Sequence, residues 1–180
     1  LFQNADDASL QHPPAEEARF RVESQLDRIR TLHWGRLLTH QGHSKEIGQR
    51  EGYARDLANM LLLNFSDKSE DVTGRFGLGF KSVHLVAHEV RIASRWMACR
   101  IHGGMIPSEW PEGPRISEQE KRAGRPATVI DLELDMEQNG EVSVKAVVDA
   151  FRTAAPWLPA MSRKIRRIEI EGEGTWTAER

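Results

Sequence analysis

Short runs in which apolar and charged residues alternate are the feature that most constrains the fold of this chain. The clearest run is Thr128–Met136 (TVIDLELDM), and similar alternation occurs at Ala18–Glu23, Glu89–Trp96 and Met97–His102. A period of two places the apolar side chains on one face of a strand, so each run predicts a half-buried strand. Helical patterns separate these runs without a regular strand–helix–strand rhythm, which predicts an α+β fold built in layers.

Other segments complete this expected order of elements. Apolar residues at helical spacing predict helices at Leu1–Leu10, before Pro13 and Pro14, and at Tyr53–Phe65, Phe80–His88 and Val144–Leu158. We expect further strands between Ile29 and Thr39 and around Ile165–Ile170, a loop at Ser66–Thr73, and an irregular connection at Gly103–Pro126. The residues after Thr175 carry no signal for a closing element.

Composition excludes several classes of protein for the 180 residues. The 25 basic and 27 acidic residues give a net charge of −2, which disfavours a globally basic nucleic-acid binder. The longest apolar run, Met60–Leu63, is far shorter than the roughly 20 residues of a membrane span. The single cysteine, Cys99, excludes an internal disulfide and a cysteine-rich zinc site, and we expect it to be a small buried side chain. A reducing, cytoplasmic location is the expectation.

The glycine-dense segment Gly74–Ser82 (GRFGLGFKS) is the sharpest local signal. Its glycines permit close approach to a ligand, and the helix expected directly behind them would offer free N–H groups to a phosphate, beside Lys81. It is not a P-loop, because Phe80 separates Gly79 from the lysine, and it lacks the third glycine of a dinucleotide fingerprint. Taken alone, a structural glycine turn fits the segment about as well as a nucleotide loop.

Asn4 and Asp7 stand one helical turn apart near the start of the chain. An amide oxygen suits Mg²⁺, which prefers oxygen ligands, and the carboxylate could accept a hydrogen bond from a base or a water. Polar residues near a helix end are usually only solvated, so this pair is a weak signal by itself.

Together the two segments resemble a known family. Leu1–Ala8 (LFQNADDA) is similar to the N box of the GHKL ATPases, which include gyrase B, the ninety-kilodalton heat-shock chaperone, histidine kinases and MutL, and Gly74–Ser82 is similar to their second glycine box. The amino-acid sequences of the two motifs are most similar to those of the sacsin-like branch of this family. Further similarities follow in chain order at His40-Gln41-Gly42, Ser66-Asp67-Lys68, Thr128–Leu132, Trp157-Leu158-Pro159 and Ile165–Ile168, so the resemblance covers essentially all 180 residues.

The resemblance implies one GHKL-type ATP-binding domain over residues 1–180 with a Bergerat-type two-layer α/β sandwich, in which helices cover one face of a mostly antiparallel mixed sheet. ATP and Mg²⁺ are the implied cofactors, and Asn4 is the implied metal ligand. The implied ATP-binding residues are Asn4, Asp7, His40, Gly42, Ser66, Lys68, Gly74, Arg75, Phe76, Gly77, Leu78, Gly79, Phe80, Lys81 and Thr128.

Two departures from the family pattern matter. The family's general-base Glu begins the N box, immediately before the position of Leu1, so we expect an excised domain whose catalytic residue lies outside this chain. The first glycine box usually reads Asp-x-Gly, with the Asp on the adenine amino group, and His40 stands at the matching position. A histidine can also bond adenine, but the pairing of donors and acceptors differs.

These features predict a Mg-dependent ATPase domain of a larger sacsin-like, chaperone-like protein, which couples nucleotide state to closure of a lid near Ser66–Thr73. The implied partners are ATP or ADP, other domains of the parent chain and a homodimer, with no membrane and no nucleic acid. Two alternatives stay open: a nucleotide-binding switch with little hydrolysis, and an interaction module that kept only the fold.

Other clusters have simpler interpretations. His84 and His88 have the spacing of a zinc-binding helical pair but lack an adjacent glutamate, so a structural role is favoured. For His33, His40 and His43, turn chemistry or base recognition is favoured over metal binding. The basic run Arg163–Arg167 is expected to be a solvated strand edge or an interdomain contact more than a nucleic-acid site.

Overall fold

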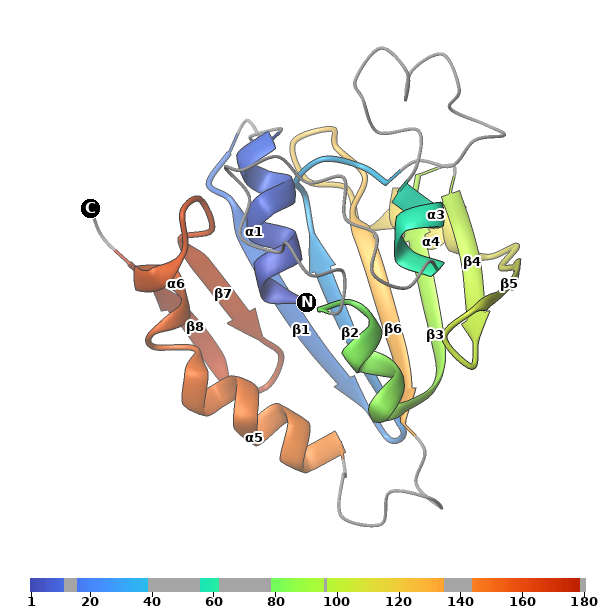
Figure 1. Cartoon of the computed structure of the whole chain (residues 1–180). Helices are drawn as coiled ribbons and strands as arrows, with labels where there is room; N and C mark the ends of the chain where they lie inside the picture. Colours follow the sequence, from blue (N-terminus) through green and yellow to red (C-terminus); the bar gives the residue numbers. More distant parts are fainter. Residues whose placement is uncertain (12–15, 39–55, 62–78, 96, 135–143, 179–180) are drawn as a thin grey trace.

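The computed structural model describes residues 1–11, 16–38, 56–61, 79–95, 97–134 and 144–178. Within these residues, one eight-stranded sheet has the order β5-β4-β3-β6-β2-β1-β7-β8 (Figure 1). Only β1 and β7 pair in parallel; the other described pairs are antiparallel. The strands are β1 (Arg19–Gln25), β2 (Arg28–His33), β3 (Ala87–Ser94), β4 (Met97–His102), β5 (Ile106–Glu109), β6 (Thr128–Leu134), β7 (Arg167–Ile170) and β8 (Gly174–Thr177).

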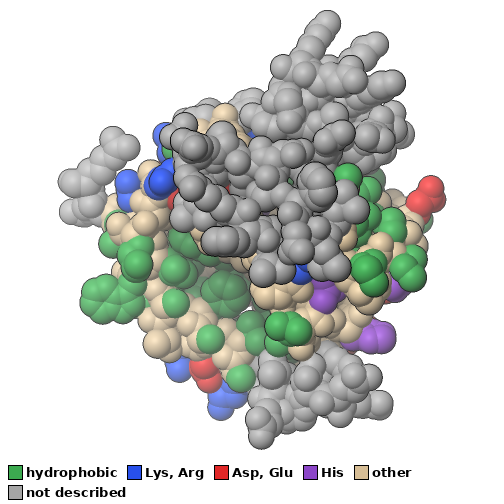
Figure 2. Space-filling model, viewed as in Figure 1, with side chains coloured by type: hydrophobic (Ala, Val, Ile, Leu, Met, Phe, Trp, Pro, Cys, Tyr) green, Lys and Arg blue, Asp and Glu red, His purple; other side chains and the backbone are tan. Residues whose placement is uncertain are grey.

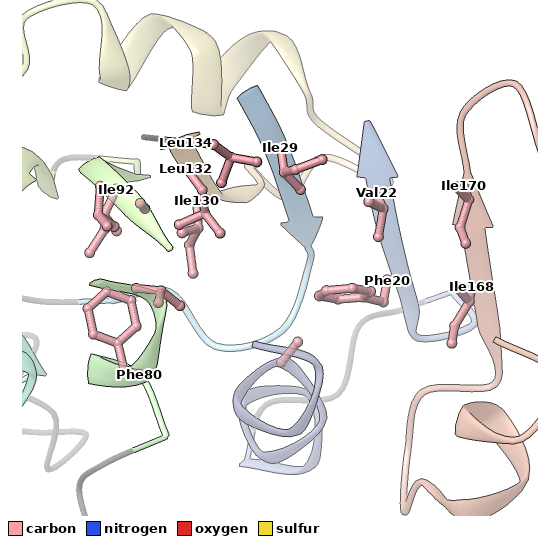
Figure 3. Packing of buried hydrophobic residues seen from close by; sticks show 14 of the residues in the cluster. Phe20, Val22, Ile29, Phe80, Ile92, Ile130, Leu132, Leu134, Ile168 and Ile170 are labelled. Carbon is pink, nitrogen blue, oxygen red and sulfur yellow. The ribbon is translucent and has the colours of Figure 1, made fainter. Parts of the chain in front are cut away.

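Most of the described helices cover one face of the sheet, which we call the covered face (Figure 1). They are α1 (Phe2–Gln11), α3 (Asp56–Leu61), the 3₁₀ helix η1 (Lys81–Leu85), α5 (Val144–Ala154) and α6 (Leu158–Met161). Their apolar side chains pack on the strand residues that point to this face (Figure 3). The buried core there includes Phe20, Val22, Ile29, Phe80, Val90, Ile92, Ile101, Ile130, Leu132, Ile168 and Ile170. The α+β fold predicted from the alternating runs is therefore confirmed.

The opposite face carries charged side chains between the strands' apolar residues. Arg30 donates two hydrogen bonds to Asp131 across β2 and β6, at 2.6 and 2.8 Å. Glu169 on β7 accepts from Arg167 of the same strand at 2.9 Å and from Arg122 at 3.2 Å. On the covered side, by contrast, the described surface shows more hydrophobic than charged side chains (Figure 2).

One described helix departs from the expected placement on a single face. Helix α4 (Gly113–Gln119) packs on the opposite face, over a small cluster containing Trp34, Ala93 and Trp110. Gly113 permits this contact, because a Cβ there would lie 2.6 Å from the Cβ of Ala98. The prediction of an irregular connection over Gly103–Pro126 was therefore wrong, since β5 and α4 both lie inside it.

The prediction of a helix over Phe80–His88 was also largely wrong. The helical part is a five-residue 3₁₀ helix, and Ala87 already belongs to β3, where it pairs with Leu134 of β6. His88 is therefore on a strand, and the helical spacing assumed for His84 and His88 does not exist. At the other end, β8 pairs with β7, so the chain does have an element after Thr175.

The loop expected at Ser66–Thr73 and both ends of the helix expected at Tyr53–Phe65 lie outside the described residues, although the middle of that helix is confirmed as α3. The other remaining elements are confirmed with shifted ends. The first helix is α1, the runs at Ala18–Glu23, Glu89–Trp96, Met97–His102 and Thr128–Met136 correspond to β1, β3, β4 and β6, and the strand expected between Ile29 and Thr39 is β2, which ends at His33. The helix expected at Val144–Leu158 ends earlier and is followed by α6. Cys99 is buried, as expected. No helix among the described residues has both the length and the apolar character needed to cross a membrane.

Helix α1 lies against the segment that follows β2. The Arg36 N–H donates to the Ala8 carbonyl at 2.8 Å, and a Cβ on Gly35 would lie 2.6 Å from the Ser9 nitrogen and 2.7 Å from the Ala8 carbonyl carbon. Backbone atoms cannot move aside as a flexible side chain can, so only glycine fits at this position. The backbone of α1 can therefore lie directly against the segment after β2 because Gly35 has no side chain.

Gly35→Ala is predicted to lower the free energy of unfolding by about 1–3 kcal/mol, the usual cost of overpacking. Chemical denaturation followed by circular dichroism would measure it. Gly79→Ala is the matched control, because a Cβ there meets nothing within 4 Å and the residue does not take a positive φ. Equal stability of the Gly35→Ala protein and the wild type would contradict the close contact.

Candidate functional site

The carboxylate of Asp6 fixes α1 to the turn between α6 and β7. Its Oδ2 accepts from the Arg163 N–H, and its Oδ1 accepts from the Lys164 and Ile165 N–H groups, each at 2.8 Å. Asp6 is buried, and three hydrogen bonds satisfy a carboxylate that would otherwise be costly to bury. The backbone of the basic run Arg163–Arg167 thus helps to hold α1 in place, a structural role that the charges of its side chains did not predict.

The same helix carries Asn4 and Asp7, one turn apart as predicted. Asp7 is buried and Asn4 is half-buried. Phe80 and η1 cover the same face of the sheet and share its core with Ala5 of α1 (Figure 3). Lys81, the first residue of η1, donates to the Leu61 carbonyl at the end of α3 at 3.3 Å. The structure thus brings the helix of the first motif and the end of the glycine segment to one face of the sheet.

Polar side chains cross the covered face in a single row at one end of the sheet. His33 at the end of β2 pairs with Thr128 at the start of β6, and Thr128 pairs with Ser94 at the end of β3. All three side chains are buried in a layer that is otherwise mostly apolar. The Ser94 and Thr128 hydroxyls share a hydrogen bond at 2.8 Å, and Ser94 Oγ also accepts from the Leu38 N–H at 2.9 Å. We call His33, Thr128 and Ser94 the polar row.

The polar row lies next to the C-terminal half of α1. Gly35, two residues beyond His33, contacts the backbone of Ala8 and Ser9. On the other side of His33, Phe20 of β1 is its strand neighbour and contributes an apolar wall. The predicted ATP-binding residue Thr128 is therefore the middle member of the polar row, between His33 and Ser94.

Burial keeps His33 neutral. Desolvation, with the positive charge of Arg36 as the next contribution, lowers the pKa of the His33 imidazole to about 3. The Gly35 N–H donates to Nδ1 at 3.3 Å, so that nitrogen carries the lone pair and Nε2 carries the proton. The ring therefore presents one N–H donor, fixed in direction by the backbone that follows β2.

An ion pair ties the segment after β2 to α3. Arg36 donates to both carboxylate oxygens of Asp56, at 2.6 and 3.0 Å, and its Nε donates to the Gln11 side chain at 2.8 Å. Both partners of the ion pair are mostly buried. Because bidentate guanidinium–carboxylate pairs are directional, Arg36 fixes α3 relative to the end of α1.

The structure places only part of the predicted site. Asn4, Asp7, Phe80, Lys81 and Thr128 all lie on or beside the covered face. Gly79 is exposed without backbone strain, so its conformation alone gives no reason for glycine there. The remaining predicted residues lie outside the described part of the chain: His40, Gly42, Ser66, Lys68, Gly74, Arg75, Phe76, Gly77 and Leu78.

Sequence reasoning gave no site role to Gly35, Ser94 or Arg36. A usable signal did exist for one pair, because His33 and Gly35 form a His-x-Gly pattern directly at the end of β2. For Ser94 and Arg36 the sequence offers no signal, because their partners lie on distant strands and helices.

The described residues contain no group of three or more metal-ligating side chains. Within the described part of the chain, both ring nitrogens of His84 are buried without a hydrogen-bond partner, and burial lowers the pKa of this residue. His88 is exposed on β3. His84 on η1 and His88 on β3 therefore do not share one helix face, which the zinc-pair spacing had assumed.

The fold is similar to that of type II topoisomerase ATPase regions. The ATPase region of Saccharomyces cerevisiae topoisomerase II superposes with a TM-score of 0.61 and 16% identity, covering 96% of this chain and 46% of that one. The same region bound to ICRF-187 gives 0.60 and 17%, with the same coverage. The ATPase and transducer domains of DNA topoisomerase II from Balamuthia mandrillaris give 0.61 and 16%, covering 96% and 45%.

This similarity shows the fold alone. The chain has the GHKL, or Bergerat, fold, and it spans less than half the length of these structures. No protein-family model matches the chain, and no curated protein matches it. The mostly antiparallel mixed sheet implied by the family resemblance is confirmed, whereas the sacsin-like assignment stays a prediction.

The low pKa of His33 predicts a pH-dependent stability. The unfolded chain takes up a proton near the ordinary histidine pKa of 6.5, but the folded chain does so only near 3. Between these values the unfolded state binds more protons, so stability falls as pH falls. We expect His33 to contribute a loss of about 1 kcal/mol per pH unit between pH 6 and 4.

Urea denaturation across this pH range would measure the effect. His33→Asn should flatten the pH dependence of the unfolding free energy, while His102→Asn, at an exposed strand position, should leave it as in the wild type. The same slope in wild type and His33→Asn would show that His33 is not held neutral in the folded protein.

Proposed function

We propose that this chain binds a nucleoside triphosphate, taken first to be ATP, together with Mg²⁺ on the covered face. The observation that carries the proposal is the meeting of α1, η1 and the polar row on one side of a GHKL fold. Two sequence motifs from distant parts of the chain, Leu1–Ala8 and Gly74–Ser82, supply the first two of these parts, and a buried polar group supplies the third. Buried polar side chains are costly in an apolar layer unless they are hydrogen-bonded or contact a ligand.

The proposed roles follow from the side chains. The Asn4 amide oxygen is a suitable Mg²⁺ ligand, and Lys81 supplies a positive charge for the phosphates. Asp7 and the polar row serve the base and sugar. Because η1 is a 3₁₀ helix of only five residues, we assign phosphate binding to backbone N–H groups of the glycine segment and to Lys81, and not to a helix dipole.

Hydrolysis would need a general base in addition to these groups. We propose a glutamate immediately before the position of Leu1, as in the family that the sequence resembles. Turnover would then couple the nucleotide state to the segment between α3 and η1, which connects two elements at the site. A sacsin-like parent protein and a homodimer are parts of the same proposal.

Lys81→Ala is predicted to weaken ATP binding by about tenfold or more, because a charge-assisted hydrogen bond contributes about 1.5–3 kcal/mol. Adenosine binding should not change, since the lysine is assigned to phosphate. Isothermal titration calorimetry would measure both ligands, with Lys145→Ala at an exposed position of α5 as the control. Flat titrations of the wild type with ATP and ADP would reject the nucleotide proposal and favour an interaction module.

Asn4→Ala is predicted to remove the response of ATP affinity to Mg²⁺ while leaving the helix intact, because alanine is the best helix former. Titrations of ATP with and without Mg²⁺ give the readout and do not require hydrolysis. Gln3→Ala, at the exposed neighbouring position of α1, should keep the wild-type response. If Asn4→Ala keeps the response as well, the metal is held elsewhere.

A further inference from the structure

An open groove crosses the opposite face of the sheet at one edge, over β1, β7 and β8, which lie side by side (Figure 1). Its volume is about 750 Å³, which is within the usual range of small-ligand sites. Arg21 in this groove has its own partner, Glu23, at 3.0 Å. The charge of the groove therefore depends on the three other arginines that line it, which are Arg19, Arg122 and Arg167. We call these three residues the arginine cluster.

The arginine cluster shares a single carboxylate. Glu169 accepts a hydrogen bond from Arg167 at 2.9 Å and one from Arg122 at 3.2 Å. Arg19 donates to the same carboxylate at 3.4 Å. Arg19 and Arg167 also stand directly opposite each other in the parallel pairing of β1 and β7, where like charges destabilise a sheet. Three positive charges against one negative charge leave an excess of two.

The other carboxylates near the groove compensate this excess only weakly. Glu16 lies 3.8 Å from Arg19, too far for a hydrogen bond, and its side chain is 54% exposed. Glu171 and Glu173 are exposed beside the turn between β7 and β8, and Glu173 pairs with Arg152 of α5 at 3.5 Å. Water and salt screen such exposed charges, whereas the arginine cluster and Glu169 are partly buried and are screened less.

The protein holds the arginine cluster in place before any ligand binds. Arg122 begins a tight turn in which its N–H donates to the Arg125 carbonyl at 3.0 Å and its carbonyl accepts from the Arg125 N–H at 2.9 Å. Its guanidinium carbon lies 4.7 Å from the centre of the Trp34 ring, a cation–π contact. Arg19 Nε is buried and has no hydrogen-bond partner among the described residues. Because a guanidinium has five N–H donors, the cluster can bind a second oxyanion without losing Glu169.

We propose that the groove binds a phosphate monoester group, held by the arginine cluster. The excess of two positive charges matches the charge of such a group, about −1.5 to −2 at pH 7. Guanidinium groups also form paired hydrogen bonds with phosphate oxygens, so their geometry suits this ligand. The groove and the proposed nucleotide site lie on opposite faces of the sheet, so the two proposals are independent.

Isothermal titration calorimetry at about pH 7.5, where the phosphate dianion prevails, tests the proposal. The probes are inorganic phosphate and a short phosphoserine peptide, and the control is the same peptide without its phosphate. The wild-type chain should bind both phosphate probes and not the control peptide. Tighter binding of the phosphopeptide would identify a phosphorylated protein segment as the source of the group, and tighter binding of inorganic phosphate would identify a small phosphate compound. Both results support the site.

Substitutions with opposite expected effects locate the binding. Arg122→Gln should weaken both phosphate probes at least about tenfold, because it removes a charge-assisted hydrogen bond. Arg122→Lys, which keeps the charge but not the paired geometry, should recover part of the affinity. Glu169→Gln raises the excess charge from two to three and should tighten binding, which a merely structural charge network would not do. Arg115→Gln, at an exposed position of α4, is the matched control and should bind as the wild type does.

The proposal fails if the wild type binds neither phosphate probe, or if it binds the unphosphorylated peptide equally well. Equal affinity of the wild type and Arg122→Gln would also overturn it, and phosphate bound only at the nucleotide site would give this result. If Glu169→Gln does not fold, nitrogen NMR of the wild type replaces it. Inorganic phosphate should shift the Nε–H signal of Arg19 more than that of Arg115, and equal shifts would overturn the proposal.

Discussion

The attachment of α1 to the rest of the fold is the constraint on which the candidate site depends. One end of this attachment is the Asp6 carboxylate, which accepts three backbone N–H bonds from the turn before β7. The other is the close approach of Gly35 to the helix backbone. Asn4 and Asp7 flank Asp6 in sequence, so the contacts that hold the helix also set where these two side chains lie. A site built on a helix that is fixed at two points needs little reorganisation to bind.

The two faces of the sheet are stabilised by different means, and this difference bears on where a ligand could bind. The covered face buries a continuous apolar core, which supplies most of the free energy that holds helices on the sheet. The opposite face is lined by paired charges such as Arg30 and the buried Asp131, whose two hydrogen bonds satisfy a carboxylate that would otherwise be costly to bury. We therefore place the proposed nucleotide on the covered face, which offers both apolar contact and isolated polar groups.

The polar row is the exception within that apolar layer. Burying His33, Thr128 and Ser94 side by side costs desolvation, which hydrogen bonds from Gly35 and Leu38 and between the two hydroxyls offset in part. In the proposed function the polar row serves the base and sugar of the nucleotide.

The sequence by itself determined the first helix and the described strands other than β5 and β8, because alternation and helical spacing are local properties that survive in any arrangement. Motif resemblance likewise singled out Asn4, Asp7 and Lys81. Only the tertiary structure decided the strand order, the 3₁₀ form of η1 and the position of α4, since Ala87 pairs with a distant strand and Gly113 packs on another face. It also decided the chemistry of His33: its burial and its hydrogen bond from Gly35 fix both its charge and its tautomer, and no local pattern encodes either.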